Sequence, residues 1–329
     1  MNKRKLGRTA LYVSELCLDA TKLGWDNDDT SAFALLDAYY AAGGRFIETL
    51  GAADQETPSF LPAGGSEELV GRWRQARGID RDKLVLATRL AFTRPSRGGS
   101  MAFVNHVREA CERSLRRLGT RHLDLLVCDW QDALVPLDDV VEAVDMLIRA
   151  GRLRHAVAGG FPAWRVVDSL HRSEVRNLPR FEAVQGEYSL LSRGPAEREI
   201  LPMCREHRLG FVARSPLAGG FLAQHPAVPG ELGISGRDWQ SERFGCNVGD
   251  AVLDVLGGIA DRRRVPVARV ALAWALHHPQ VSSAVISAPG TRELDELLGA
   301  TEMFLTPDEV AALAEVTSVQ DPRMELRHV

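Results

Sequence analysis

The chain has 329 residues, of which 45% are hydrophobic and 26% are charged, and its formal net charge is -4. This composition is sufficient for a full hydrophobic core, and the length suits one α/β barrel of about 250 residues with insertions. The weak negative charge predicts no strong attraction to nucleic acid or to a membrane surface. No apolar run is long enough to cross a bilayer. The five cysteines form no Cys-x-x-Cys pair, which predicts reduced thiols in a cytoplasmic protein.

Strand-like and helix-like segments alternate along the chain in cycles of roughly 30 to 40 residues. Several strand-like segments are almost continuously apolar, as expected for a parallel sheet that is covered on both faces. The predicted strands are VSELCLD (13–19), RFIET (45–49), KLVLATR (83–89), LDLLVCD (123–129), LRHAVAG (153–159), FEAVQGE (181–187), GFVARS (210–215) and SAVIS (283–287). Eight strand–helix units predict an α/β fold, a closed (β/α)8 TIM barrel that forms one domain over residues 1–329.

Helices are predicted between these strands, and three segments fall outside the repeating cycle. The helix over 66–78 begins with Ser66, a favoured N-cap residue. Residues 1–12 are predicted to form a small hairpin at the bottom of the barrel. A long loop rich in Gly and Pro follows the seventh strand over 217–248, and loops of that length are usually functional or mobile. An additional C-terminal helix is predicted over 306–318.

Several sequence segments, spread over the whole chain, resemble the signature segments of the aldo-keto reductases. These segments are KLGRTALYVSEL, GGSEELVGRW, RDKLVLATR, SLRRLGTRHLDLLV, LIRAGRLRHAVAGG, VQGEYSLLSR and SPLAGGFL. The resemblance implies a (β/α)8 barrel of a family that uses NADPH to reduce carbonyl groups. It also implies a catalytic tetrad of Asp, Tyr, Lys and His at the mouth of the barrel.

All four tetrad positions carry a different residue in this chain. By the resemblance, the Asp falls on Glu48, the Tyr on Ala53, the Lys on Arg89 and the His on Asp129. Alanine cannot donate a proton, and Asp54 is only a shorter substitute one residue further along. Proton donation to a carbonyl oxygen is therefore not expected to follow the family pattern.

The positions that hold the nicotinamide in the family are only partly retained. The glutamine on the sixth strand is present as Gln185, which makes it a candidate for binding cofactor or substrate. The Ser-Asn pair after the fifth strand falls on Gly159 and Gly160, which offer only backbone groups.

The phosphate-binding positions show a similar mixture. The segment SPLAGG keeps the small turn that approaches the pyrophosphate, so Ser215, Leu217 and Gly219 are candidate cofactor contacts. After the eighth strand, the arginine that clamps the 2′-phosphate falls on Pro289, and the asparagine that contacts adenine falls on Leu297. Proline cannot replace a guanidinium group at a phosphate, although the nearby Arg292 is a possible substitute.

New charged residues at the strand ends suggest a different chemistry. Asp19, Glu48 and Asp129 are predicted to stand with Arg89 as a catalytic group at the mouth. One alternative is that Glu48 and Arg89 form a structural ion pair, and another is that the carboxylates hold a divalent cation. No histidine accompanies them, which argues against zinc, and no metal ligand is assigned.

Further residues are predicted to line the substrate pocket. They are Trp130, Trp25, Lys22 and Arg214, together with Gln185. Core packing is an equally good account of the two tryptophans, and solvation in a loop is an account of the lysine. Cys128 precedes Asp129 and should point away from the barrel interior, because side chains alternate along a strand.

Three functions remain open from the sequence, and the substrate is expected to be a small molecule in each enzymatic case. The preferred one is a cofactor-independent enzyme that performs dehydration, isomerisation or hydrolysis on a small polar metabolite. The second is a divergent oxidoreductase that uses NADP or NAD. The third is a non-catalytic binding or regulatory protein. The oligomeric state is not predicted.

Overall fold

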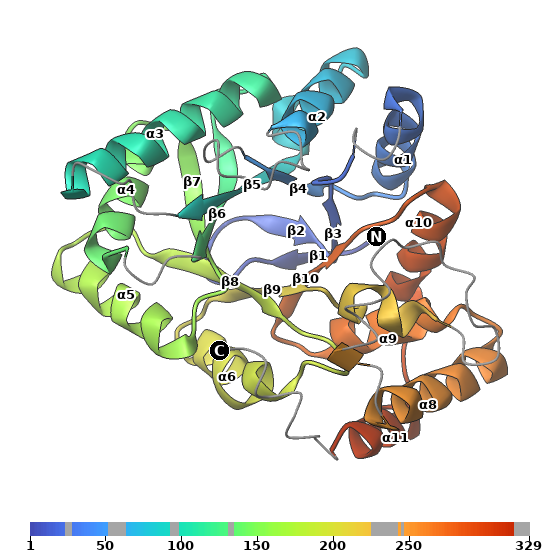
Figure 1. Ribbon diagram of the computed structural model, residues 1–329. Helices are drawn as coiled ribbons and strands as arrows, with labels where there is room; N and C mark the ends of the chain where they lie inside the picture. Colours follow the sequence, from blue (N-terminus) through green and yellow to red (C-terminus); the bar gives the residue numbers. More distant parts are fainter. Residues whose placement is uncertain are drawn as a thin grey trace.

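The computed structural model describes residues 1–23, 28–51, 64–92, 99–130, 135–224, 243–244 and 247–318. Eight parallel strands close into a barrel in the order β10-β3-β4-β5-β6-β7-β8-β9, and helices surround it (Figure 1). The barrel strands are β3 (Leu16–Asp19), β4 (Phe46–Leu50), β5 (Val85–Phe92), β6 (Leu123–Trp130), β7 (Leu153–Gly159), β8 (Phe181–Glu187), β9 (Gly210–Arg214) and β10 (Val281–Ile286). The predicted (β/α)8 barrel is confirmed.

The helices form the outer layer of the molecule (Figure 1). They are α1 (Asp29–Ala41), α2 (Gly65–Ala76), α3 (Gly99–Leu118), α4 (Leu137–Arg149), α5 (Ala163–Val175), α6 (Leu201–Glu206), α8 (Asn247–Arg263), α9 (Val267–His277), α10 (Thr291–Leu298) and α11 (Pro307–Ser318). Helix α11 is the additional C-terminal helix, and it packs against α8. No helix within the described ranges is long and apolar enough to cross a membrane.

The N-terminal hairpin pairs β1 (Lys3–Lys5) with β2 (Tyr12–Ser14), so it extends two residues beyond its predicted end. Leu6 and Val13 of this hairpin are fully buried, and they pack into the same apolar cluster as the barrel interior. The hairpin therefore closes the bottom of the barrel, at the amino ends of the strands.

Strand alternation divides the barrel residues between two apolar cores. The inner core includes Cys17, Phe46, Ala87, Val127, Val157, Ala183 and Val212, together with the hairpin residues. The residues between them face the helices and belong to the larger outer core, which includes Cys128. Because successive side chains point to opposite faces, the residue two positions after each inner-core residue points inward again, toward the mouth.

The loop after the seventh barrel strand is described only at its two ends. A short 3-10 helix, η3 (Ala218–Ala223), follows β9, and α8 begins at Asn247. The rest of the predicted loop, apart from residues 243–244, lies outside the described residues.

Candidate active site

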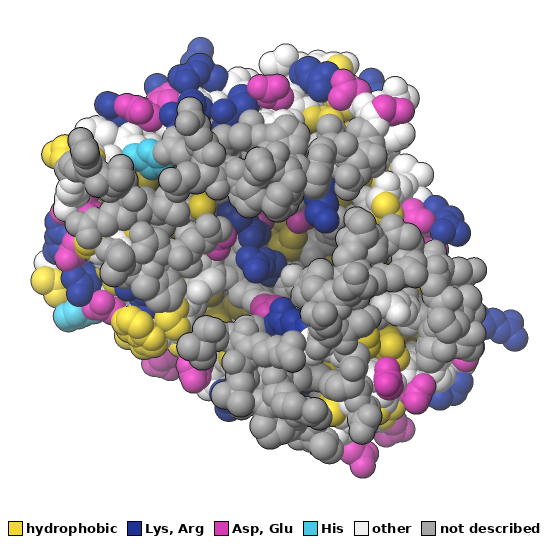
Figure 2. Space-filling model, in the orientation of Figure 1, with side chains coloured by type: hydrophobic (Ala, Val, Ile, Leu, Met, Phe, Trp, Pro, Cys, Tyr) yellow, Lys and Arg dark blue, Asp and Glu magenta, His cyan; other side chains and the backbone are white. Residues whose placement is uncertain are grey.

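A layer of inward-facing residues lies at the carboxyl ends of seven barrel strands. Each member stands two positions beyond an inner-core residue, and the members are Asp19, Glu48, Arg89, Asp129, Gly159, Gln185 and Arg214. Active sites of (β/α)8 barrels form at this end. Figure 2 shows basic and acidic side chains in a hollow at the centre of the visible face. The layer contains all four residues predicted as catalytic.

Glu48, Arg89 and Gln185 form a closed ring of hydrogen bonds at the mouth, which we call the mouth ring. The Arg89 Nε donates to Glu48 Oε1 at 3.2 Å, and its Nη2 contacts the same oxygen. The Nη2 also donates to Gln185 Oε1 at 2.9 Å, and Gln185 Nε2 donates to Glu48 Oε2 at 2.5 Å. The ion pair expected between Glu48 and Arg89 is therefore present. The ring joins β4, β5 and β8.

Electrostatics keep Arg89 in its charged form. Burial by itself lowers the pKa of Arg89, but the carboxylates of Glu48, Asp129 and Asp19 raise it, and the net pKa lies above the ordinary value. Arg89 can therefore donate hydrogen bonds and stabilise negative charge, but it does not release a proton.

The two remaining acids do not combine with Glu48 into a metal site. Asp19 Oδ1 accepts a hydrogen bond from the Thr21 backbone nitrogen at 2.9 Å. Asp129 is half-buried and lies beside Gly160, where a Cβ atom would stand 3.6 Å from Asp129 Oδ1. Among the described residues, no three His, Cys, Asp or Glu side chains are grouped to hold a metal ion. The suggested divalent-cation cluster is not found there.

Two glycines at the end of β7, the fifth barrel strand, bring backbone close to this layer. Gly160 has a φ of +70°, and its nitrogen donates to the backbone oxygen of Gln185 at 3.1 Å. A Cβ on Gly159 would lie 2.9 Å from Val127 Cγ1, so a serine at this position would require a shift. The floor of the mouth between Asp129 and Gln185 is therefore formed by backbone.

The turn after β9 has an unusual backbone conformation. Ser215 and Ala218 have φ values of +51° and +50°, and Gly219 and Gly220 also lie in the left-handed region, at +68° and +103°. Side-chain-bearing residues rarely adopt this conformation, and such strain is concentrated at functional sites. The turn contains the three predicted cofactor contacts, Ser215, Leu217 and Gly219.

The charged residues at the edges of the mouth have partners of their own. Arg214 is exposed, and in the strand ladder it lies opposite Glu187. The Oε2 atom of Glu187 forms an ion pair with Arg243 Nη2 at 2.9 Å. On α10, Arg292 is 79% exposed, and its Nη2 contacts Glu293 Oε1 at 3.0 Å. The predicted substitute for the 2′-phosphate arginine is thus paired with an adjacent carboxylate.

Several other predicted positions lie apart from this constellation or outside the description. Lys22 is exposed in a turn after β3. Trp25, Ala53 and Asp54 fall outside the described residues, as does the side chain of Trp130. Cys128 is buried in the outer core, as strand alternation predicted, and burial raises the pKa of its thiol.

A buried polar network that was not predicted from the sequence lies on the outer side of β4 and β5. Thr49 and Thr88 hydrogen-bond to each other, Thr88 contacts Glu67, and Glu67 pairs with Arg117. The available signal was two threonines at outward-facing positions in strands that otherwise present apolar side chains to the helices.

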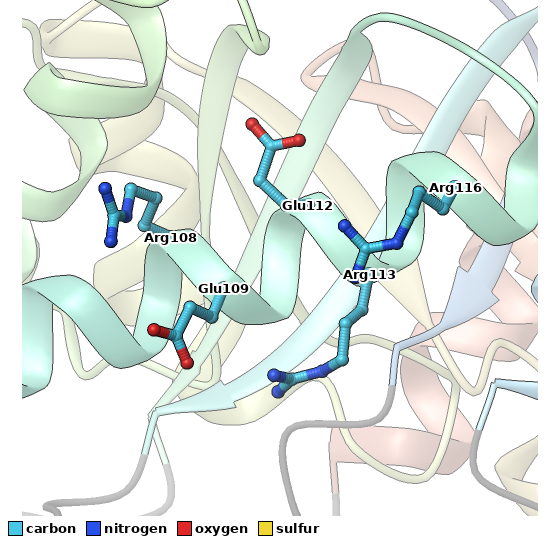
Figure 3. Close-up of a pocket in the computed structure, with 5 residues that line it drawn as sticks. All are labelled: Arg108, Glu109, Glu112, Arg113 and Arg116. Carbon is cyan, nitrogen blue, oxygen red and sulfur yellow. The ribbon is translucent and has the colours of Figure 1, made fainter.

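A separate pocket on α3 takes no residue from a barrel strand. Its lining side chains all project from this one helix (Figure 3) and are Arg108, Glu109, Glu112, Arg113 and Arg116. Glu112 is paired with Arg152 at 2.9 Å. The pocket is a feature of the outer helix surface and adds nothing to the mouth.

Comparison with known proteins identifies related sequences over nearly the whole chain. The model of the aldo/keto reductase family matches residues 15–318. An uncharacterised oxidoreductase, YrpG, of Bacillus subtilis is 30% identical, with 94% of each chain covered. Norsolorinic acid reductase B of Aspergillus parasiticus is 29% identical, covering 92% of this chain and 81% of the relative. Versiconal hemiacetal acetate reductase of the same species is 27% identical, with 96% of each covered.

These comparisons overturn two predictions made from the sequence. The preferred function, non-redox chemistry without a cofactor, is wrong, because the family and its named reductases point to oxidoreduction and to a nicotinamide cofactor. The error has a physical origin. Hydride transfer is the chemistry of the cofactor, while the protein supplies binding, orientation and electrostatics, so replaced side chains do not by themselves remove it. With its match over residues 15–318, the chain belongs to the aldo/keto reductase family.

Proposed function

We propose that this protein is a nicotinamide-dependent oxidoreductase that interconverts a carbonyl group and an alcohol on a small-molecule substrate. In this proposal, residues 1–329 form a single domain. By the resemblance, the tetrad positions of the family fall on Glu48, Ala53, Arg89 and Asp129, so in this proposal the protein handles the substrate oxygen and its proton differently from the family pattern.

The observation that carries the proposal is the strained turn after β9. Among the residues that the structure describes, five other than glycine have a left-handed backbone. Three of them directly follow the ends of helices, where this conformation is a normal cap, and they are Asn177, Arg208 and Arg264. The other two, Ser215 and Ala218, follow a barrel strand instead. Turns of this kind can orient backbone N–H groups toward an anion, so the segment fits the pyrophosphate of a dinucleotide.

Gln185 fits the nicotinamide end of the same cofactor. An amide has two N–H donors and an oxygen with two lone pairs. The bonds to Glu48 and Arg89 use one N–H donor and one oxygen lone pair. One N–H and one lone pair of the amide are left to bind a ligand. When bound, the cofactor supplies or accepts the hydride.

Arg89 and Asp129 are the residues proposed to act on the substrate oxygen. Reduction of a carbonyl group adds one hydride to carbon and one proton to oxygen. Arg89 stays protonated and would stabilise the developing negative charge on oxygen by hydrogen bonding. Asp129, half-buried at the end of β6, would orient a water molecule that delivers the proton to the oxygen.

The test is a calorimetric titration of the purified protein with NADH and with NADPH. We expect at least one of them to bind with a Kd below the millimolar range, which is about -4 kcal/mol. Loss of reduced-nicotinamide absorbance in the presence of a panel of aldehydes and ketones would then report hydride transfer. Absence of binding by both nucleotides at millimolar concentration would overturn the proposal. D129N should bind the nucleotide normally but turn over more slowly.

A further inference from the structure

A buried polar network lies directly behind the Glu48–Arg89 pair. The hydroxyl groups of Thr49 on β4 and Thr88 on β5 are 2.9 Å apart. Thr88 Oγ1 donates to Glu67 Oε1 at 3.2 Å, and Arg117 Nε donates to Glu67 Oε2 at 2.7 Å. Thr49, Thr88 and Glu67 are all fully buried. We call these four residues the rear cluster.

The rear cluster and the mouth ring are adjacent in sequence and lie on opposite faces of the same two strands. Thr49 follows Glu48, and Thr88 precedes Arg89. In the barrel ladder, Thr49 is directly opposite Thr88. Because side chains alternate, a displacement of either threonine is transmitted through one peptide unit to a charged residue of the mouth ring.

The rear cluster also meets the backbone where β4 ends and α2 begins. The Leu50 nitrogen donates to the hydroxyl of Ser66 at 3.2 Å, and the Gly51 nitrogen donates to the Arg89 oxygen at 3.0 Å. A Cβ on Gly64 would lie 2.3 Å from Arg117 Nε, so the guanidinium packs against bare backbone. The end of β4, the start of α2 and the cluster therefore form one packed unit.

Stability alone is a weak reason for this arrangement. Burial raises the pKa of Glu67 and outweighs the opposing effect of Arg117, so the carboxylate is held at a cost. A buried ion pair can often be replaced by apolar side chains with no loss of stability. What apolar side chains would not reproduce is a directional link between β4, β5, α2 and α3.

We propose that the rear cluster is a positioning device, in which Glu67 and Thr88 fix the orientation of Arg89 relative to Glu48 at the mouth. The use of this position in cofactor and substrate binding rests on the function proposed above. The positioning itself does not, because it concerns only contacts within the chain.

The experiment compares two Thr→Val variants of the full chain. T88V removes the hydroxyl that joins the two strands to Glu67. T120V is the matched control at the bottom of the barrel, where Thr120 Oγ1 accepts a hydrogen bond from Arg81 Nε at 2.9 Å. For each variant we would measure the melting temperature, the NMR-detected hydrogen exchange of the Arg89 Nε–H, and the Kd of the bound nicotinamide nucleotide. The R89K variant assigns the Nε–H signal.

We expect both variants to lower the melting temperature, but only T88V to change the Arg89 signal. Its Nε–H should exchange about tenfold faster, which corresponds to the loss of roughly one hydrogen bond. The nucleotide Kd should rise in T88V and stay within twofold in T120V, and T88S should restore the wild-type values. If T88V does not fold, E67Q replaces it with the same expected direction.

Unchanged Arg89 exchange in a destabilised T88V protein would overturn the positioning role and leave the rear cluster purely structural. Failure of the wild-type protein to bind either nucleotide would instead count against the proposed function. The two failures are distinguishable, because the Arg89 measurement needs no nucleotide.

Discussion

Arg89 binds Glu48 and Gln185 at the same time, so its guanidinium is oriented by two neighbours and not by charge alone. Arginine presents its donors in a rigid planar fork, whereas a lysine is a mobile point charge. By the resemblance seen in the sequence, the lysine of the family falls on Arg89, and an arginine there would preserve the positive charge and change the direction in which it is presented. In the proposed function, the mouth ring is a preorganised hydrogen-bond donor for the substrate oxygen.

The mouth ring makes a prediction about Gln185, which is 2% exposed. Methionine has a similar length but has no amide, so Q185M would leave Glu48 Oε2 without its donor in a buried place. We expect the free energy of unfolding to fall by about 1–3 kcal/mol and the nucleotide Kd to rise. Urea denaturation and calorimetry measure the two effects.

The control for this change is Q280M at the other end of the barrel. Gln280 is half-buried, and its Nε2 donates to the Leu209 backbone oxygen at 2.9 Å. It should lose less stability than Q185M and should bind nucleotide normally. An equal loss in both variants, with normal binding in both, would show that Gln185 has no special role in the ring.

Among the strands and helices, the elements whose bounds were predicted correctly are those with a clear local sequence pattern. Strands β7 and β8 span the predicted residues, because each is an apolar run bounded by clear turn residues. Ser66, predicted as an N-cap, is instead inside α2, and Gly64 with a φ of +82° precedes the helix. The serine hydroxyl accepts from the Leu50 nitrogen, a tertiary contact that helix-capping rules do not include.

The candidate site was predictable in position but not in its contacts. Strand alternation places Asp19, Glu48, Arg89 and Asp129 in one inward-facing layer, and this follows from the sequence alone. The closure of the ring by Gln185 depends on barrel curvature, which brings β8 across to β4 and β5. The contact between Thr88 and Glu67 was not predicted for a different reason, because Glu67 lies on helix α2 and the strand pattern does not show which helix residue packs behind β5.

Helix α10 leads to a prediction about which nucleotide is preferred. Glu293 lies in its first turn, and a hydrogen bond from its own backbone nitrogen lowers the pKa of its carboxyl group. Arg292 is paired with this carboxylate and is not available to a phosphate without competition. We expect E293Q to strengthen binding of NADPH up to about fivefold, since an exposed ion pair contributes up to about 1 kcal/mol. Binding of NADH, which lacks the 2′-phosphate, should hardly change.

The D295N variant carries the same charge change two residues further along, on an exposed position of α10. Calorimetric titration at low salt with both nucleotides should show that the NADPH-to-NADH ratio of Kd values changes in E293Q and not in D295N. Equal shifts in the two variants would indicate a general charge effect and would remove Glu293 as a determinant of nucleotide preference.

Charged residues make different kinds of contact at the two ends of the barrel. At the mouth, Arg89 is held in the ring while 15% of its side chain stays exposed. At the bottom, Asp124 is 1% exposed, and its Oδ2 binds both Arg81 Nη2 at 2.7 Å and the Leu86 nitrogen at 2.9 Å. Arg154 Nη1 contacts its other oxygen at 3.0 Å. These contacts tie the turn before β5 to the first residues of β5, β6 and β7, at the opposite end of the strands from the mouth residues.

This division predicts that D124N damages stability and spares the site. The variant leaves Arg81 half-buried without its anionic partner, so the free energy of unfolding should fall by about 3 kcal/mol. D82N is the matched control, because Asp82 contacts the same Arg154 at 3.4 Å but is 81% exposed, and its loss should stay below about 1 kcal/mol. Urea denaturation measures both, while nucleotide affinity and the Arg89 Nε–H exchange should remain at wild-type values in each. A changed Arg89 signal in D124N would mean that the barrel transmits strain from bottom to mouth, and the rear cluster would then lose its claim to be the local determinant of Arg89.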